Sequence, residues 1–434
     1  MLAAAGVAIA LTRKDGSDTG QVASRSTTST ASTATTAAGS STTSPPAALP
    51  PAQAKVIDEI RGQVAELRGL QWKTPLDVAI LPRNDFQQEL KRVNDRDRHA
   101  DRQTGDGETY KLLKLIPRSL NYDKALEDLY GSAVVGFYDP KTKKLLIGAN
   151  GGTLDPAARL TIAHEMDHAL TDQHFNFGER TNTLDIGDKQ EELQGFIGLL
   201  EGDAKVMESL WSTKYLTAKE RQTLTSSGDL TAFYRSPKYL RDSLLYPYTS
   251  GQAWALRLYQ QTKSWRLIDA AYADPPRSTE EVLHLDRYEA KPRRGWSPPQ
   301  LPPLTAGTDC AAVRSGTIGE FNMIELLDQN LTLNDAAVSA DGWNGDAFQV
   351  VRCGTALAMV DRWEADDATA AGRLADGLAR WAREWSGGTP PGSDGRFTGS
   401  AGSGRIVRNG TRVDLVLADD APSADKVAAA AGVA

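Results

Sequence analysis

The segment Thr161–Phe175, TIAHEMDHALTDQHF, concentrates residue types that bind metals and transfer protons. His164 and His168 are four residues apart, so on a helix both imidazoles project from one face and can hold one Zn²⁺ at about 2.0–2.1 Å. Glu165 lies beside the first histidine, where its carboxylate can take a proton from a zinc-bound water. This H-E-x-x-H spacing is typical of zinc peptidases and predicts peptide-bond hydrolysis by a Glu165-activated, zinc-bound water.

A helix must present these side chains, and the flanking sequence predicts one. Asp155 suits an N-cap and Pro156 suits a first helical turn, so we expect a helix from there to about Gln173. Before it, two β-rich runs flank DPKTKK and predict a β-hairpin. An edge strand beside a catalytic helix can pair with an extended peptide. Either Ala133–Tyr138 or Lys144–Asn150 is a candidate for that edge, and interior sheet is the alternative.

A zinc site needs a third protein ligand. A second long helix is expected after Asp188 and extends to about Trp211, with an apolar stripe along one face. Its acidic residues are the candidate ligands: Glu191, Glu192, Glu201, Asp203 and Glu208. On the helical wheel Glu201 and Asp203 lie at opposite edges of the stripe, so the periodicity does not choose between them.

A family resemblance makes that choice. HEMDH followed on a later helix by EGDA (Glu201–Ala204) resembles the gluzincin clan of zinc metallopeptidases, whose third ligand is a Glu on such a helix. The resemblance implies Glu201 as third ligand beside His164 and His168, and Zn²⁺ as cofactor. Further segments carry it in this order: GFYDPKTKKLLI, LLEGDA, YPYTSGQAWALRLYQ, PPRSTEEVLH, GEF and GWNGD. Over about residues 55–385 the chain resembles exported bacterial metallopeptidase-like proteins, which implies a zincin fold and a peptidase.

The chain departs from thermolysin-type gluzincins around the third ligand. The interval from His168 to Glu201 is longer, and Lys205 stands where those enzymes carry an Asp that supports the ligand. Asp172, four residues after His168, is a candidate acceptor for the second N–H of that imidazole. His174, near the end of the predicted helix, is expected to cap or pack rather than bind metal.

A peptidase also needs a donor for the oxyanion that develops during hydrolysis. His284, Tyr246 and Tyr248 are candidates, because donors in related enzymes follow the third-ligand helix. We prefer His284 as the second catalytic residue, since an imidazole can also protonate the leaving amine.

The whole chain is predicted to be an α+β protein in four parts. Residues 1–52 comprise the apolar start MLAAAGVAIAL and a disordered spacer rich in Ser, Thr and Pro. Residues 53–295 form the zincin-like catalytic domain, and 296–307 form a Pro-rich linker. Residues 308–434 form a small α+β unit with a flexible tail and no recognisable chemistry. Trp343 and Asp346 in GWNGD are expected to be turn and packing residues.

The composition of the chain limits which partners it can bind and where in or outside the cell it acts. The 434 residues carry a net charge of −7 without a basic stripe, which argues against nucleic-acid binding. The apolar start and spacer predict export, with a signal or anchor segment that leaves the protein secreted or tethered outside the cell membrane. Cys310 and Cys353 then suggest one disulfide, and two buried free thiols are the alternative.

Three functions compete for this sequence. The leading prediction is an exported zinc metalloprotease that acts on a peptide or protein substrate. The alternative is a zincin-fold binding or regulatory protein with little or no proteolysis, although the intact Glu165 favours an enzyme. A purely structural zinc would require four protein ligands, often cysteines, and neither cysteine is near this segment.

Overall fold

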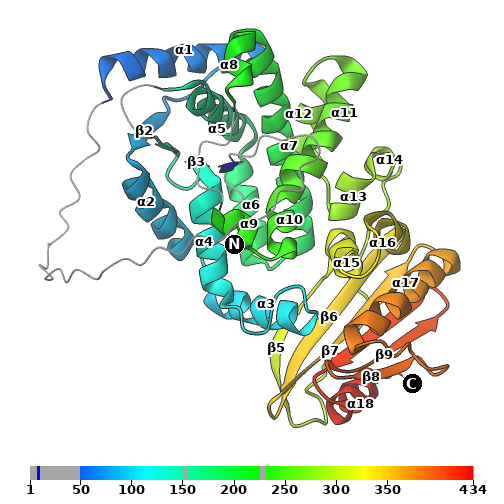
Figure 1. Cartoon of the computed structure of the whole chain (residues 1–434). Coiled ribbons are helices and arrows are strands. Elements are labelled where there is room, and N and C mark those ends of the chain that lie inside the picture. Colours follow the sequence, from blue (N-terminus) through cyan, green and yellow to red (C-terminus); the bar gives the residue numbers. More distant parts are fainter. Residues whose placement is uncertain (1–6, 10–48, 150–153, 225–230, 434) are drawn as a thin grey trace, which may run out of the picture.

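The computed structural model describes residues 7–9, 49–149, 154–224 and 231–433, and it contains two sheets flanked by helices (Figure 1). This arrangement confirms the predicted α+β class. The first part of the chain holds a four-stranded sheet in the order β1-β3-β4-β2. Its strands are β1 (Val7–Ile9), β2 (Asp77–Leu81), β3 (Val134–Asp139) and β4 (Lys144–Gly148).

Helices make up most of this first part. In chain order they are α1 (Pro51–Arg68), α2 (Arg83–Arg96), α3 (Ala100–Leu112), α4 (Tyr122–Ala133), α5 (Pro156–Phe175), α6 (Phe177–Ile186), α7 (Gln190–Tyr215), α8 (Ala218–Gln222), α9 (Thr231–Arg235), α10 (Lys238–Tyr246), the π-helical turn η1 (Pro247–Gly251), α11 (Gln252–Thr262), α12 (Arg266–Ala273), α13 (Thr279–Leu283) and α14 (Leu285–Glu289). None of the helices in the described ranges is both long and apolar enough to cross a membrane.

The predicted hairpin is confirmed as β3 and β4, which pair antiparallel. Neither strand is an edge among the described residues, because β1 pairs with β3 and β2 pairs in parallel with β4. Val7–Ile9, which belong to the predicted apolar export segment, form β1. The rest of that segment and the spacer up to residue 48 lie outside the described residues.

The two helices that carry the candidate ligands form as predicted. Asp155 caps α5, with its Oδ1 accepting a hydrogen bond from the amide of Ala158 at 2.8 Å, and Pro156 occupies the first turn. Every α5 residue from Ile162 to Asp172 is buried, because α1, α7 and the hairpin surround this stretch. The same apolar cluster includes Leu193, Phe196, Leu200, Met207 and Trp211 of α7. Packing of α5 against α7 therefore places the HEMDH segment of α5 beside the EGDA segment of α7.

The C-terminal unit is built on a six-stranded sheet in the order β5-β6-β7-β10-β9-β8. Its elements are β5 (Cys310–Gly316), α15 (Gly319–Leu327), α16 (Leu333–Ala340), β6 (Trp343–Cys353), β7 (Ala356–Ala365), α17 (Ala368–Ser386), β8 (Arg396–Gly399), β9 (Gly402–Asn409), β10 (Arg412–Ala418) and α18 (Ala421–Ala430). Side chains alternate along the central strands, as the two-residue period of a strand requires. Met359 and Leu415 belong to the cluster shared with α17, whereas Val360 and Val416 belong to the cluster shared with α18.

The C-terminus differs from its prediction as a flexible tail. Residues Ala421–Ala430 form α18, which begins with Asp420 accepting a hydrogen bond from the amide of Ser423 at 2.7 Å. Val427 is fully buried against the sheet. The small alanine side chains let this helix pack on the strands. The composition of the segment alone does not reveal this packing.

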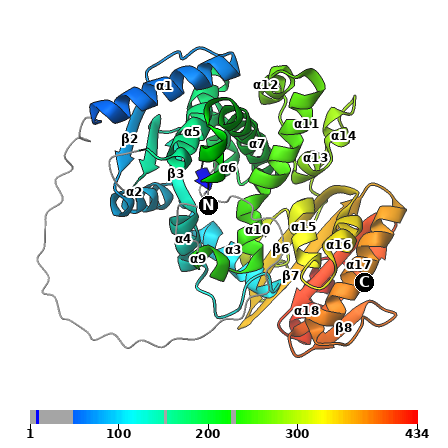
Figure 2. The ribbon, with the colours of Figure 1, turned by 45° about the horizontal axis from the view of Figure 1, so that its top comes forward.

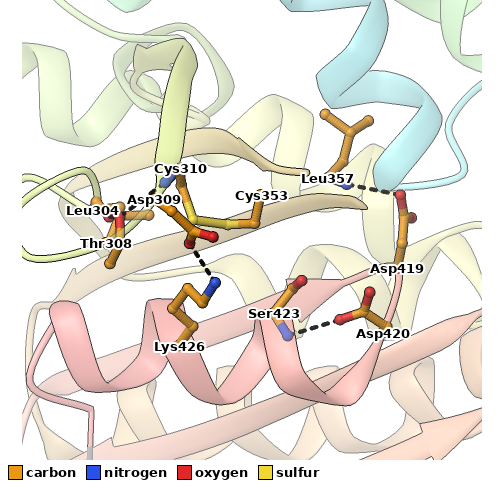
Figure 3. The surroundings of a disulfide bond; sticks show 10 residues. All are labelled: Leu304, Thr308, Asp309, Cys310, Cys353, Leu357, Asp419, Asp420, Ser423 and Lys426. Carbon is orange, nitrogen blue, oxygen red and sulfur yellow. Dashed lines mark hydrogen bonds and ion pairs between the residues drawn. A yellow bond between two sulfur atoms is a disulfide. The ribbon is translucent and has the colours of Figure 1, made fainter. Parts of the chain in front are cut away.

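The predicted disulfide is confirmed between Cys310 and Cys353, which lie opposite each other in β5 and β6 (Figure 3). Beside it, Lys426 of α18 forms an ion pair with Asp309. The disulfide thus joins the edge strand β5 covalently to β6. The ion pair holds α18 beside the disulfide.

The predicted linker, residues 296–307, packs against the C-terminal unit. The Trp296 ring lies 4.8 Å from that of Trp343, and the side chain of Gln349 binds the carbonyls of Leu301 and Pro302. In addition, helices α3, α4 and α10 share one hydrophobic cluster with the C-terminal unit. In both views α15 stands between α13 and the six-stranded sheet (Figures 1 and 2). The two parts therefore form one packed body.

Candidate metal centre

Three buried side chains predicted as metal ligands meet between α5 and α7. The Nε2 atoms of His164 and His168 are 3.2 Å apart. Glu201 Oε2 is 3.2 Å from the first of these nitrogens and 3.3 Å from the second. The three atoms thus form a nearly equilateral triangle.

The triangle has the dimensions that zinc requires. Ligand atoms around a tetrahedral ion at about 2.0–2.1 Å stand about 3.3–3.4 Å from one another. Two imidazole nitrogens and one carboxylate oxygen are also a donor set that zinc favours. Burial lowers the pKa of His164, but hydrogen bonds to Glu201 and Glu208 outweigh it and raise that pKa to about 10. The residues present therefore fit a zinc ion, and their electrostatics favour a cation.

The structure distinguishes Glu201 from Asp203 as the third ligand, a choice that the helical wheel left open. Glu201 faces the two histidines, whereas Asp203 faces Arg68 of α1, with a 2.9 Å contact to its guanidinium. The same buried guanidinium contacts Asp167 of α5 at 3.3 Å and Asp269 of α12 at 2.7 Å. Arg68 ties both ligand-bearing helices together behind the metal centre, and no sequence motif pointed to it.

A carboxylate orients the first histidine. The Nδ1–H of His164 donates to Glu208 Oε2 at 3.2 Å, and Lys205 forms an ion pair with Glu208. A carboxylate that holds the second nitrogen of a ligating histidine fixes its tautomer and ring orientation. Glu208 lies two turns after Glu201, on the same helix face. Lys205 replaces the supporting Asp of thermolysin-type enzymes, and here Glu208 is the carboxylate that holds a proposed ligand.

Asp172 does not orient His168, contrary to prediction. Its carboxylate accepts hydrogen bonds from the Tyr138 hydroxyl at 2.8 Å and from Lys143 at 2.6 Å, so it binds the hairpin. His168 Nδ1 has no hydrogen-bond partner within the described part of the chain. His174 bonds to the carbonyl of Gln71 at 2.8 Å, in agreement with the packing role expected for it.

The predicted general base lies against the hairpin. Glu165 is fully buried, and its Oε2 accepts a hydrogen bond from the backbone amide of Tyr138 at 2.8 Å. Its charge raises the pKa of both His164 and Tyr248. Strand β3 therefore holds the base beside the triangle of ligand atoms.

Tyr248 is the sequence candidate that reaches the metal centre. Its ring stacks on that of His164 at a centroid distance of 6.3 Å and an angle of 27°. Burial raises the pKa of Tyr248 well above its ordinary value, and the charges of Glu201 and Glu165 raise it further. Tyr248 belongs to η1, and single π-helical turns within helical segments are frequent at functional sites.

Backbone contact between α7 and η1 explains the glycines of two sequence motifs. A Cβ on Gly202 would lie 2.2 Å from the carbonyl oxygen of Gly251, and one on Gly251 would lie 2.3 Å from that of Gly198. Only glycine allows this approach. Gly202 of LLEGDA and Gly251 of YPYTSG thus let η1 carry Tyr248 over Glu201.

The other two oxyanion candidates lie elsewhere. His284 is at the junction with the C-terminal unit, where its Nε2 is 2.8 Å from Glu320 Oε1. Among the described residues, no hydrogen bond or ion pair connects His284 to the three ligands, so its predicted catalytic role finds no support. Tyr246 packs on Phe321 at a ring distance of 4.5 Å.

His284, Glu320 and Asp341 form a second group with the composition of a metal site. Arg287 already supplies its positive charge. Its guanidinium lies 2.6 Å from Asp341 Oδ1 and 4.0 Å from Glu320 Oε2. We therefore regard this group as an ion-pair network between the two parts of the chain.

Comparison with known proteins bears on the C-terminal unit. Residues 308–429 match the family model of a domain of unknown function, DUF8575. No curated protein and no solved structure matches the chain. The matched range excludes α5 and α7, so a functional proposal depends on the geometry of the metal centre.

Proposed function

We propose that this protein is a zinc-dependent peptidase of zincin type, with His164, His168 and Glu201 as its metal ligands. The observation that carries the proposal is the triangle of three ligand atoms, 3.2–3.3 Å on each side, beside a buried Glu165. Three protein ligands leave a position for water or substrate, which is the pattern of catalytic zinc sites. Structural zinc sites usually have four protein ligands.

The side chains around the triangle suit hydrolysis. A zinc ion bound there would acidify a water and polarise the scissile carbonyl. Glu165 accepts a proton from the attacking water and passes it to the leaving nitrogen. The Tyr248 hydroxyl, which stays protonated because its pKa is raised, donates a hydrogen bond to the oxygen that becomes negative.

We also propose that the protein is exported and acts outside the cell, secreted or tethered through its N-terminus. The disulfide between Cys310 and Cys353 supports an oxidising compartment. The apolar start and the Ser/Thr/Pro-rich spacer of residues 16–52 support the same conclusion.

Metal content and a variant of the base test the peptidase proposal. We expect about one zinc per chain by elemental analysis, and its loss in His168→Ala. In Glu165→Gln we expect zinc to be retained while cleavage of a degenerate peptide library falls by about 10²–10⁴-fold, because the proton acceptor is gone.

Two other results would contradict this proposal. A protein that stays free of zinc after reconstitution at neutral pH has no metal centre. A zinc-loaded protein that cleaves no peptide, and whose biological effect survives in Glu165→Gln, belongs to the binding or regulatory class.

A further inference from the structure

A pocket begins at the metal centre and extends to the C-terminal unit. Glu201 and Tyr248 line one end of it. It follows α7 towards the start of that helix, past Ile197 and Glu191, and reaches Phe321 and Phe348 of the C-terminal unit. Because Glu201 lines this pocket, one end of it opens beside the three proposed ligand atoms.

The pocket is suited to an apolar group of limited size. Its volume of about 160 Å³ is close to the roughly 150 Å³ of an engineered apolar cavity that binds benzene. Leucines at the C-terminal end of α3, in α4 and in α10 contribute apolar surface to its lining: Leu113, Leu126, Leu129, Leu240 and Leu244.

The charges in the lining are already matched. Arg314 Nε lies 2.7 Å from Asp106, and the same guanidinium binds Asp188 at 2.6 Å. Burial raises the pKa of Glu191 to about 8, although hydrogen bonds from Thr279 oppose the shift, so burial favours the neutral carboxyl group. A charged substrate side chain would therefore find no partner charge there except at the metal centre.

Buried polar contacts fix the wall that the C-terminal unit contributes. Asp346 accepts hydrogen bonds from the amides of Ile318 and Gly319, at 2.6 and 2.9 Å. The Thr279 hydroxyl receives one from the amide of Phe321 at 3.2 Å and donates one to Glu191 at 2.6 Å. The sequence segments GWNGD, GEF and PPRSTEEVLH meet in these contacts. Through Thr279 they connect Phe321 to Glu191 of α7, the helix that carries Glu201.

We infer that the C-terminal unit completes the specificity pocket of the peptidase, and that the pocket takes an apolar, ring-sized side chain of the substrate residue beside the scissile bond. The inference rests on the proposed peptidase function. It gives the DUF8575 unit of this chain a role in substrate selection, with Phe321 and Ile318 as specificity-determining residues.

Two variants of the full chain change the pocket in opposite directions. Phe321→Ala widens it, so we expect library cleavage to shift towards larger aromatic side chains by about tenfold in relative kcat/KM. Leu126→Trp fills it, so we expect cleavage beside Phe and Leu to fall by about tenfold and small side chains to be preferred. Leu333→Trp is the matched control, because Leu333 is exposed on α16 and does not line the pocket.

Direct binding provides a readout apart from catalysis. In Glu165→Gln protein, ligand-observed NMR should detect N-acetyl-phenylalaninamide but not N-acetyl-glycinamide. The signal should disappear when Leu126→Trp is added and persist with Leu333→Trp. Thermal melting confirms that each variant folds.

The outcomes separate this inference from the peptidase proposal. Cleavage without an apolar preference, or with a preference that Phe321→Ala and Leu126→Trp leave unchanged, overturns the inference and leaves the peptidase standing. Selective binding of the phenylalanine amide by a protein without zinc or cleavage overturns the peptidase and supports the pocket's preference.

Discussion

The chemistry proposed for the candidate metal centre depends on how neighbouring groups hold each polar side chain. Glu208 orients His164, and the backbone amide of Tyr138 holds Glu165. Arg68 forms ion pairs with Asp167 of α5 and Asp203 of α7. Buried charged groups are tolerated only when partners neutralise them, so these supporting residues determine whether the ligands keep their positions.

Removal of the Tyr248 hydroxyl tests the proposed oxyanion donor. We expect Tyr248→Phe to keep its zinc and its KM, while kcat falls by about 10²–10³-fold, which is the usual cost of losing one such donor. Steady-state kinetics on a library-derived peptide, with zinc analysis of the same sample, measure both quantities.

Tyr246→Phe is the matched control, two residues earlier in the chain. Within the described structure the Tyr246 hydroxyl is buried without a hydrogen-bond partner, so its removal should leave kcat unchanged. Equal kcat values for Tyr248→Phe and the wild type would exclude the hydroxyl of Tyr248 as the donor.

At the scale of elements, the centre depends on close packing between α7 and η1. Gly198, Gly202 and Gly251 bring the two backbones together, and this contact places Tyr248 above the ligands. The helices α5 and α7 supply the ligands, β3 supplies the amide that holds the base, and η1 supplies the candidate donor. The site is therefore assembled from four elements, two of which carry no metal ligand.

Substitution of Gly202 tests this packing. In Gly202→Ala the new methyl would lie 2.2 Å from the carbonyl oxygen of Gly251, so η1 has to move away. We expect a loss of about 1–3 kcal/mol in the free energy of unfolding, as for other overpacked cores, together with weaker zinc binding. Chemical denaturation and a zinc-chelator titration measure the two effects.

Gly62→Ala in α1 is the control for the same change in a helix. A Cβ there meets no atom within 4 Å, so stability should stay equal or rise by about 0.4–1 kcal/mol. If both variants were equally stable and bound zinc equally well, close contact with η1 would not be needed for the centre.

At the scale of the whole molecule, the junction between the two parts is rich in buried carboxyl groups. Burial is the main cause that raises the pKa of Glu191 to about 8, of Glu280 to about 8 and of Asp346 to about 6. Glu191 belongs to α7, Glu280 to α13 and Asp346 to β6 of the C-terminal unit. Because burial opposes the charged form of these groups, their ionisation should lower the stability of the folded protein.

This arrangement predicts that stability falls as the pH rises. Between pH 4.5, the ordinary pKa of Glu191, and about 8, its pKa in the folded protein, the folded state binds more protons than the unfolded state. Stability therefore decreases through that range. We expect Glu191→Gln to melt near the wild-type temperature at pH 5 and above it at pH 8.5, with a flatter dependence on pH.

Thermal melting of both proteins in the same buffers measures that difference. Parallel pH profiles for Glu191→Gln and the wild type would show that Glu191 is ionised in the folded protein and that its hydrogen bonds with Thr279 stabilise the charge.

The sequence by itself determined the features that depend on local spacing. The helix period places His164 and His168 on one face, Asp155 and Pro156 mark where α5 begins, and DPKTKK marks the hairpin turn. The α+β class follows from the same local patterns. These features depend on residues within a few positions of one another, which a sequence displays directly.

Only the tertiary structure decided which distant groups meet. It placed Glu201 and not Asp203 at the histidines, and Tyr248 and not His284 beside them. It showed that Glu208, one of the candidate ligands, holds His164, and that Arg68 joins the two helices. It also packed the predicted linker and tail onto the sheet. These outcomes depend on how helices pack and on which buried charges need partners, and neither has a signature in the spacing of residues along the chain.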